Sequence, residues 1–233
     1  MAGGSGTGAY SERCRYRAKA DAPRLIGSGG AWRGRPQAKC PPGGGRGFEL
    51  QGHSAREPFF TKKDQADKDR DLTRVMGHST PARGDVIEVS GRVLDESGSP
   101  IAGALVDVWQ ANAAGRYDHE ADPNPAPLDP DFQGWARLTT DAKGRYRIRT
   151  IKPGRYPVRE GWSRPPHTHF KVARRGFREI TTQMYFDGHA LNDIDLLWNK
   201  LTPEERARVT VAFTAAADGA PPAGRFDLVL AQV

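Results

Sequence analysis

The sequence predicts an all-β fold, an antiparallel β-sandwich with short helices. From Asp85 onward, short segments rich in β-branched residues alternate with clusters of glycine, proline, serine and aspartate, the pattern of strands joined by turns. Roughly eight such segments follow one another, as in a sandwich of two antiparallel sheets. One strong helix start occurs at Thr202-Pro203-Glu204-Glu205, which combines an N-cap, a proline at the first helical position and a capping glutamate.

In chain order, the expected strands cover residues 86–94, 104–110, 136–140, 145–151, 167–173, 180–186, 209–213 and 226–233. Side chains alternate along a strand, so Val106 and Val108 share one face, and Leu105 and Asp107 share the other. Asp141-Ala142-Lys143-Gly144 has the composition of a hairpin turn between two of these strands. The helix that starts at Thr202 is short and comes late, so we expect it to decorate the sandwich.

Charge and glycine content divide the chain into three parts. Residues 1–84 carry 16 Lys+Arg and 8 Asp+Glu, a net charge of +8, whereas residues 85–233 carry 19 and 20, a net charge of −1. Residues 1–54 also hold 13 of the 27 glycines and show no hydrophobic period. We therefore expect a disordered Gly/Arg-rich leader over 1–54, an extended or partly helical connector over 55–84, and a β-sandwich domain over 85–233.

The composition also bounds the partners and the location. The sandwich domain is nearly neutral, so a folded nucleic-acid-binding face is not expected on it. No run of 18 apolar residues occurs and the first 30 residues have no apolar core of a signal peptide, so we expect no membrane span and a cytoplasmic protein. Both cysteines, Cys14 and Cys40, lie in the leader, which leaves no thiolate metal site in the sandwich.

The segment His167-Thr168-His169 is a candidate metal site. On a strand, residues two apart point to the same face, so both imidazoles can approach one atom. Neutral imidazole is a ligand for zinc, copper and iron. Glu160 is the only carboxylate between Ile151 and Glu179, so an ordinary zinc site is not complete nearby. The alternative is two histidines on a half-buried strand.

Two tyrosines could complete the ligand set. Tyr117 follows a polar loop of small residues, and Tyr156 lies between Pro153 and Pro157, which stiffen the backbone. A loop tyrosine usually packs as an amphipathic residue. Because phenol ionises near pH 10, a tyrosinate ligand requires a strong Lewis acid. Ferric iron is such an acid and also accepts imidazole, so the four side chains together favour iron.

The chain from about residue 74 to residue 233 resembles the intradiol ring-cleavage dioxygenases, and most closely their protocatechuate 3,4-dioxygenase β-subunit branch. The blocks that carry the resemblance occur in family order at residues 91–93, 108–113, 126–130, 149–154, 164–170, 183–186 and 225–230. The resemblance implies a non-haem Fe(III) enzyme that cleaves a catechol between its two hydroxyls with O2 to a cis,cis-muconate-type diacid. An α-type subunit or a homo-oligomer is the implied partner.

The resemblance also implies roles for individual residues. The implied iron ligands are Tyr117, Tyr156, His167 and His169. Tyr156 is the ligand expected to leave when substrate binds and to accept a proton. Arg164 is expected to stabilise negative charge on the aromatic ring, and Gln183 to line the site.

Two departures from the family concern the pocket wall. Val158 stands where the family has a tryptophan, and the loop from Val158 to Arg164 is shorter. The resemblance therefore does not determine which catechol is the substrate. Residues 91–104 and 140–146 also resemble non-catalytic prealbumin-like sandwich modules, so a scaffold role is one alternative. A β-type subunit that is inactive without an α partner is another.

Overall fold

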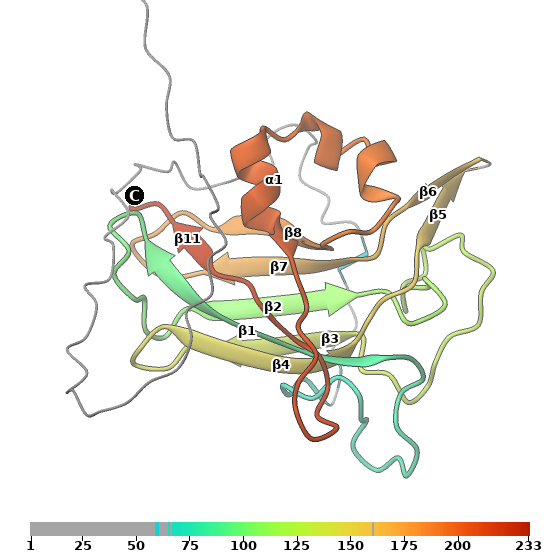
Figure 1. Ribbon diagram of the computed structural model, residues 1–233. Coiled ribbons are helices and arrows are strands. Elements are labelled where there is room, and N and C mark those ends of the chain that lie inside the picture. Colours follow the sequence, from blue (N-terminus) through green and yellow to red (C-terminus); the bar gives the residue numbers. More distant parts are fainter. Residues whose placement is uncertain (1–58, 61–64, 66, 160) are drawn as a thin grey trace, which may run out of the picture. The chain divides into compact units, whose positions relative to one another are not determined.

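The computed structural model describes residues 59, 60, 65, 67–159 and 161–233, and the expected leader over 1–54 lies outside these residues. The described residues belong to one compact unit of the chain, residues 42–233. They form two main β-sheets and a separate two-stranded hairpin (Figure 1). The all-β sandwich that the sequence predicts is confirmed.

The first sheet is built around β1 (Val86–Asp95), whose side chains are alternately buried and exposed through most of its length. β4 (Arg145–Ile151) pairs antiparallel with one side of β1. β10 (Ala223–Arg225) and β11 (Leu228–Leu230) pair with β1 in the parallel direction. This parallel pairing differs from a purely antiparallel sandwich. It arises because the end of the chain reaches β1 through a long connection instead of a tight hairpin turn.

The second sheet has the strand order β3-β2-β7-β8-β9. These strands are β3 (Trp135–Thr139), β2 (Leu105–Gln110), β7 (His167–Ala173), β8 (Ile180–Phe186) and β9 (Thr210–Val211). The first four pair antiparallel, and β9 pairs parallel with β8. The central position of β7 places it between β2 and β8, so both of its neighbours can contribute side chains beside its histidines.

The main hydrophobic core lies between the two sheets. Val89 and Ile148 from the first sheet and Val106 and Phe170 from the second are completely buried. The ring of Tyr146 in β4 lies 6.0 Å from that of Phe170 in β7, measured between centroids. Each such side chain contributes roughly 1.5–3 kcal/mol on burial, so this layer is the main source of stability. Val106 and Val108, which the strand period predicts to share one face, are both completely buried in this core.

The remaining elements lie outside the two main sheets. β5 (Tyr156–Arg159) and β6 (Trp162–Arg164) form a hairpin that the sequence pattern did not predict. Two 3-10 helices follow β8, η1 (Asn192–Ile194) and η2 (Trp198–Lys200). No helix in the described part of the chain is long and apolar enough to cross a membrane.

The predicted helix start is confirmed in α1 (Pro203–Val209). The backbone N–H of Glu205 donates to Thr202 Oγ1 at 3.3 Å, and the N–H of Thr202 donates to Glu205 Oε2 at 2.7 Å. The two side chains thus satisfy backbone donors that the first turn of a helix leaves open. α1 leads directly into β9 at the edge of the second sheet.

The described part of the connector packs on the sandwich. Leu72 is completely buried in the main core, and its backbone N–H donates to Arg149 O at 2.8 Å. Asp71 forms an isolated parallel bridge with Arg149. From residue 67 to residue 84 the backbone forms turns and bends, without a helix. This segment is therefore held to the first sheet by main-chain hydrogen bonds and a buried leucine.

Candidate functional site

The two histidines of β7 lie on one face of the strand, as their spacing predicts. His167 and His169 are both buried, and their ring centroids are 4.9 Å apart. Their neighbours across the sheet are Trp109 on β2, which is opposite His169, and Tyr185 on β8, which is opposite His167. The Trp109 ring stacks on His169 at 4.8 Å with an interplanar angle of 6°. The stacked Trp109 ring thus fixes the plane of the His169 imidazole.

Tyr117 brings its hydroxyl to both histidines. Tyr117 Oη lies 3.2 Å from His167 Nε2 and 3.2 Å from His169 Nε2. The tyrosine is buried, although it comes from a loop about 50 residues earlier in the chain. Three atoms that can bind a metal, one phenol oxygen and two imidazole nitrogens, therefore converge in the interior.

Tyr156, at the start of β5, lies beside this group. Its ring centroid is 5.7 Å from that of Tyr117, with an interplanar angle of 77°. Phe59 covers both tyrosines, with its ring centroid 4.9 Å from Tyr117 and 5.4 Å from Tyr156. We refer to Tyr117, Tyr156, His167 and His169 as the tetrad. The structure thus gathers in one place the four side chains that the sequence singled out.

The two loops that carry the tyrosines touch through their backbones at two glycines. Gly154 donates its N–H to Asn112 O at 3.0 Å, and a Cβ atom at Gly154 would lie 2.4 Å from Ala113 O. Gly115 has a φ of +79°, and a Cβ atom there would lie 2.0 Å from Arg155 O. Side chains at either position would force the loops apart. The glycines therefore set the separation of the two tyrosines.

A hydrogen bond to the backbone fixes which ring nitrogen of His167 faces Tyr117. Its Nδ1 lies 2.8 Å from the carbonyl oxygen of Pro165, which can only accept. Nδ1 therefore carries the hydrogen, and Nε2 presents a lone pair towards Tyr117. The same arrangement, a backbone carbonyl behind an imidazole, orients histidines that bind metals.

Burial keeps all four donors uncharged when no metal is bound. Burial, and for His167 the nearby Arg164 charge, lower the pKa values of His167 and His169 well below 6.5. Burial also raises the pKa of Tyr117 above its usual value and that of Tyr156 to about 12. At neutral pH the tetrad is thus two neutral imidazoles and two phenols.

Arg164 and Gln183, the two other site residues expected from the sequence, lie beside the tetrad. Arg164 pairs across the hairpin with Tyr156, and its Nη1 lies 3.3 Å from His167 Nε2. Its Nη2 donates to Gln183 Oε1 at 2.7 Å. Gln183 in turn is opposite His169 in the pairing of β7 with β8. A buried cation with a donor directed at the tetrad can stabilise negative charge that develops there.

A family model described as "Dioxygenase" matches residues 55–232. This range contains the whole tetrad, Arg164 and Gln183. The chain belongs to the intradiol ring-cleavage dioxygenase family.

Comparisons with individual relatives agree with the family match. The chain is 42% identical over 179 residues to the protocatechuate 3,4-dioxygenase beta chain of Burkholderia cepacia, covering 74% of this chain and 76% of that one. It is 38% identical over 119 residues to catechol 1,2-dioxygenase 2 of Acinetobacter lwoffii, covering 45% and 41% of the two chains.

Solved structures show the same fold. The dioxygenase domain of a dioxygenase–carbohydrate-binding protein fusion from Streptomyces sp. SirexAA-E matches with a TM-score of 0.57 and 31% identity, covering 77% of this chain and 96% of that one. Catechol 1,2-dioxygenase from Pseudomonas arvilla C-1 matches with a TM-score of 0.56 and 28% identity, covering 72% and 59%.

Sequence reasoning missed two polar residues that contact Arg164 beside the tetrad, Tyr185 and Asp195. Tyr185 follows Gln183 by two residues on β8, so the strand period could have placed both on one face. Asp195 lies between η1 and η2, is completely buried, and accepts a hydrogen bond from Arg164 Nε at 2.9 Å. No spacing pattern points to Asp195, because it lies outside any regular element.

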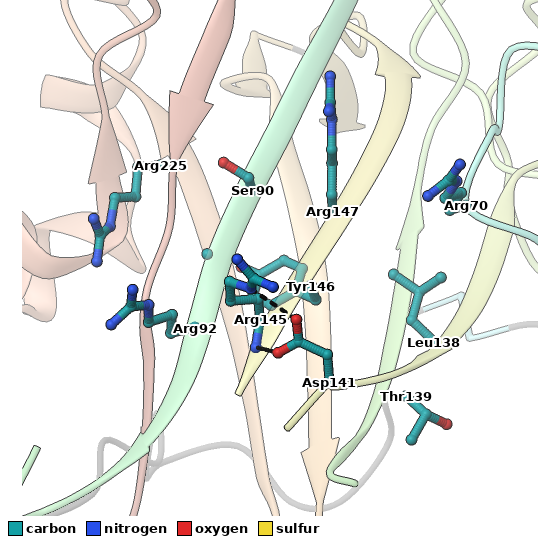
Figure 2. Close-up of a pocket in the computed structure, with 11 residues that line it drawn as sticks. Arg70, Ser90, Arg92, Leu138, Thr139, Asp141, Arg145, Tyr146, Arg147 and Arg225 are labelled. Atoms are coloured by element: carbon teal, nitrogen blue, oxygen red, sulfur yellow. Dashed lines mark hydrogen bonds and ion pairs between the residues drawn. The ribbon is translucent and has the colours of Figure 1, made fainter. Parts of the chain in front are cut away.

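A pocket of about 590 Å³ lies away from the tetrad, on the exposed faces of β1 and β4 (Figure 2). Its lining includes the arginines Arg70, Arg92, Arg145, Arg147 and Arg225. Three of them are paired with carboxylates of the same face. Arg145 lies 2.7 Å from Asp141, Arg225 lies 2.7 Å from Asp227, and Arg147 contacts Glu88. Much of the positive charge of this face is therefore compensated locally.

Proposed function

We propose that this protein is a non-haem Fe(III) intradiol dioxygenase that acts on a protocatechuate-like catechol. It would cleave the ring between the two hydroxyl-bearing carbons with O2 and release a cis,cis-muconate-type diacid. The observation that carries the proposal is the convergence of Tyr117 Oη on the Nε2 atoms of His167 and His169, with Tyr156 beside them. The 42% identity to a protocatechuate 3,4-dioxygenase beta chain supports it.

The donor set fits a ferric ion. Phenol oxygens become hard anionic ligands when they ionise, and neutral imidazole nitrogens suit first-row transition metals. The residues that would hold the ion are Tyr117, Tyr156, His167 and His169. When bound, ferric iron supplies the Lewis acidity that ionises phenols and catechol hydroxyls near neutral pH. The hydrogen bond from His167 Nδ1–H to Pro165 O keeps Nε2 free for this purpose.

Tyr156 has the properties of a proton acceptor, and Arg164 has those of a group that stabilises negative charge. Burial raises the pKa of Tyr156 to about 12, so its phenolate binds protons strongly, and Tyr156 Oη is suited to take a proton from an incoming catechol hydroxyl. Arg164 is permanently charged and buried. With Nη1 directed at the tetrad, it would stabilise negative charge on the aromatic ring.

A second candidate concerns dependence on a partner. The relative with 42% identity is named as a beta chain, so this protein could also act as a β-type subunit that needs an α-type chain for turnover. A prealbumin-like scaffold role receives no such support. A scaffold has no physical reason to bury two tyrosines and two histidines around one point.

The test is product analysis with purified protein reconstituted aerobically with iron. We expect one iron per chain, a red-brown colour from tyrosinate-to-iron charge transfer, and a ring-opened diacid that contains both atoms of ¹⁸O₂ without any added reductant. A semialdehyde product, a requirement for NADH, or a colourless zinc protein would contradict the proposal. Iron binding with turnover only after addition of an α-type chain would favour the dependent subunit.

A further inference from the structure

The guanidinium nitrogens of Arg164 make four polar contacts, and three of these are with residues outside the tetrad. Its Nε donates to Asp195 Oδ2 at 2.9 Å, and its Nη2 donates to Gln183 Oε1 at 2.7 Å and to Tyr185 Oη at 3.0 Å. Nη1 makes the fourth contact, 3.3 Å from His167 Nε2. The guanidinium is planar, so fixing Nε and Nη2 also fixes the direction in which Nη1 points.

Asp195 is itself held rigidly. Its side chain is completely buried, and Oδ1 accepts hydrogen bonds from the backbone N–H groups of Leu197 at 2.9 Å and Trp198 at 2.8 Å. Tyr185 Oη lies 3.3 Å from the same oxygen. The carboxylate is thus a fixed anion in the turn between η1 and η2, and its other oxygen is directed at Arg164.

We propose that Asp195 is a positioning residue for Arg164. It holds the Nε edge of the guanidinium so that Nη1 is directed at the place where the catechol ring would react, and it balances the buried positive charge. This inference rests on the proposed function, because Arg164 can act on the ring only if a catechol binds at the tetrad. Gln183 and Tyr185 complete the set of partners, but neither carries the opposite charge.

The geometry distinguishes arginine from lysine at position 164. A lysine ammonium could pair with Asp195, but its single nitrogen cannot occupy both positions that Nε and Nη1 of arginine take. Arg164→Lys therefore keeps the charge and still loses the donor directed at the ring. If Asp195 had no positioning role, a lysine would be free to reach towards the tetrad and replace part of the arginine's effect.

The first arm measures turnover in iron-loaded variants. Asp195→Asn is expected to lower kcat roughly 10- to 100-fold, less than the roughly 100- to 1000-fold cost of removing a preorganised donor outright, because Arg164 itself remains; iron content and visible colour should be retained. The matched control is Asp107→Asn, since Asp107 is also buried and accepts from Arg137 Nε at 2.7 Å, away from Arg164. It should lose stability while keeping kcat. Wild-type kcat in Asp195→Asn would overturn the proposal.

The second arm is chemical rescue, which a merely structural role would not change. Added guanidinium should restore part of the turnover of Arg164→Ala, because Asp195 remains to hold it, and should not restore that of Arg164→Ala/Asp195→Asn. Equal rescue of both variants would overturn the proposal. If Asp195→Asn does not fold, Arg164→Lys decides, since near-wild-type kcat in that variant would equally overturn it.

The third arm needs no activity. In ¹⁵N-labelled metal-free protein, the Nε–H of Arg164 should exchange slowly with solvent, and Asp195→Asn should abolish this protection while Asp107→Asn preserves it. Absence of protection in the wild-type protein would overturn the proposal. If the wild-type protein cleaves no catechol, the proposed function fails, and this signal alone then decides whether Asp195 holds Arg164.

Discussion

At the scale of single residues, burial of the two histidines couples stability to pH. The pKa values of His167 and His169 are well below 6.5 in the folded protein, chiefly through burial, whereas the unfolded chain protonates its histidines near the ordinary value. Below pH 6.5 the unfolded state therefore binds protons that the native state does not. The contribution of the two neutral histidines to the free energy of unfolding is fully present above that pH and decreases as the pH falls below it.

The expected effect is a loss of up to about 1.4 kcal/mol per pH unit for each histidine in the metal-free protein. Urea unfolding at about pH 7.5 and at about pH 5.5 measures it, a window above the range where carboxylates titrate. The double variant His167→Gln/His169→Gln, which cannot titrate at these positions, serves as control. The same decrease in that variant would show that other groups are responsible.

The tetrad residues should differ in their effect on metal content. His169→Ala removes a buried imidazole whose ring stacks on Trp109, and we expect most of the iron to be lost. Tyr156→Phe leaves the other three donors in place, so iron should be retained with a shifted visible band and slower substrate binding. Metal analysis and absorption spectra of both variants test this, with the half-buried His189→Ala as control. Full iron content in His169→Ala would contradict the assignment.

At the scale of elements, the contact between the two tyrosine loops controls the site. Gly154→Ala would bring a methyl group 2.4 Å from Ala113 O, so the loops must separate. We expect a loss of roughly 1–3 kcal/mol in unfolding free energy, typical of overpacking, together with reduced iron content. Gly134→Ala is the matched control, since its nearest neighbour would be 4.0 Å away. Equal behaviour of the two variants in thermal unfolding and metal analysis would refute this role.

The β5–β6 hairpin is the element expected to shape substrate choice. Its register is irregular between Pro157 and Arg159, and Val158 between them is 37% exposed. A tryptophan at that position would cover more of the surface beside Tyr156. We expect the wild-type enzyme to turn over catechol, hydroxyquinol and gallate at rates comparable to protocatechuate, and Val158→Trp to narrow the range. A strong wild-type preference for protocatechuate alone would contradict this.

At the scale of the whole molecule, the leader is predicted to be separate from the β-sandwich domain. Residues 1–54 lie outside the described residues, but their glycine-rich composition and the start of the family match at residue 55 support this prediction. A variant that lacks residues 1–54 should keep nearly the same melting temperature and iron content. Calorimetry and metal analysis of the shortened and full-length proteins decide this, and a large decrease in either quantity would show that the leader supports the fold.

The sequence by itself determined the features that depend on neighbouring residues. Strand alternation placed Val106 and Val108 on one face and both histidines on one face, and the capping pattern at Thr202 located the start of α1. These features follow from the local geometry of strands and helix ends, which repeats every few residues. The roles of Tyr117 and Tyr156 came from family resemblance, since their separation in sequence carries no geometric signal.

Only the tertiary structure decided how distant segments meet. Asp195 is 31 residues from Arg164, and the carbonyl of Arg155 is 40 residues from Gly115, yet each pair is in close contact. The parallel pairing of β10 and β11 with β1 is equally non-local. Such contacts depend on how the whole core packs, because burial of the two sheets against each other brings the loop ends together. The role proposed for Asp195, which lies in an irregular turn, follows only from the packing that places Arg164 beside it.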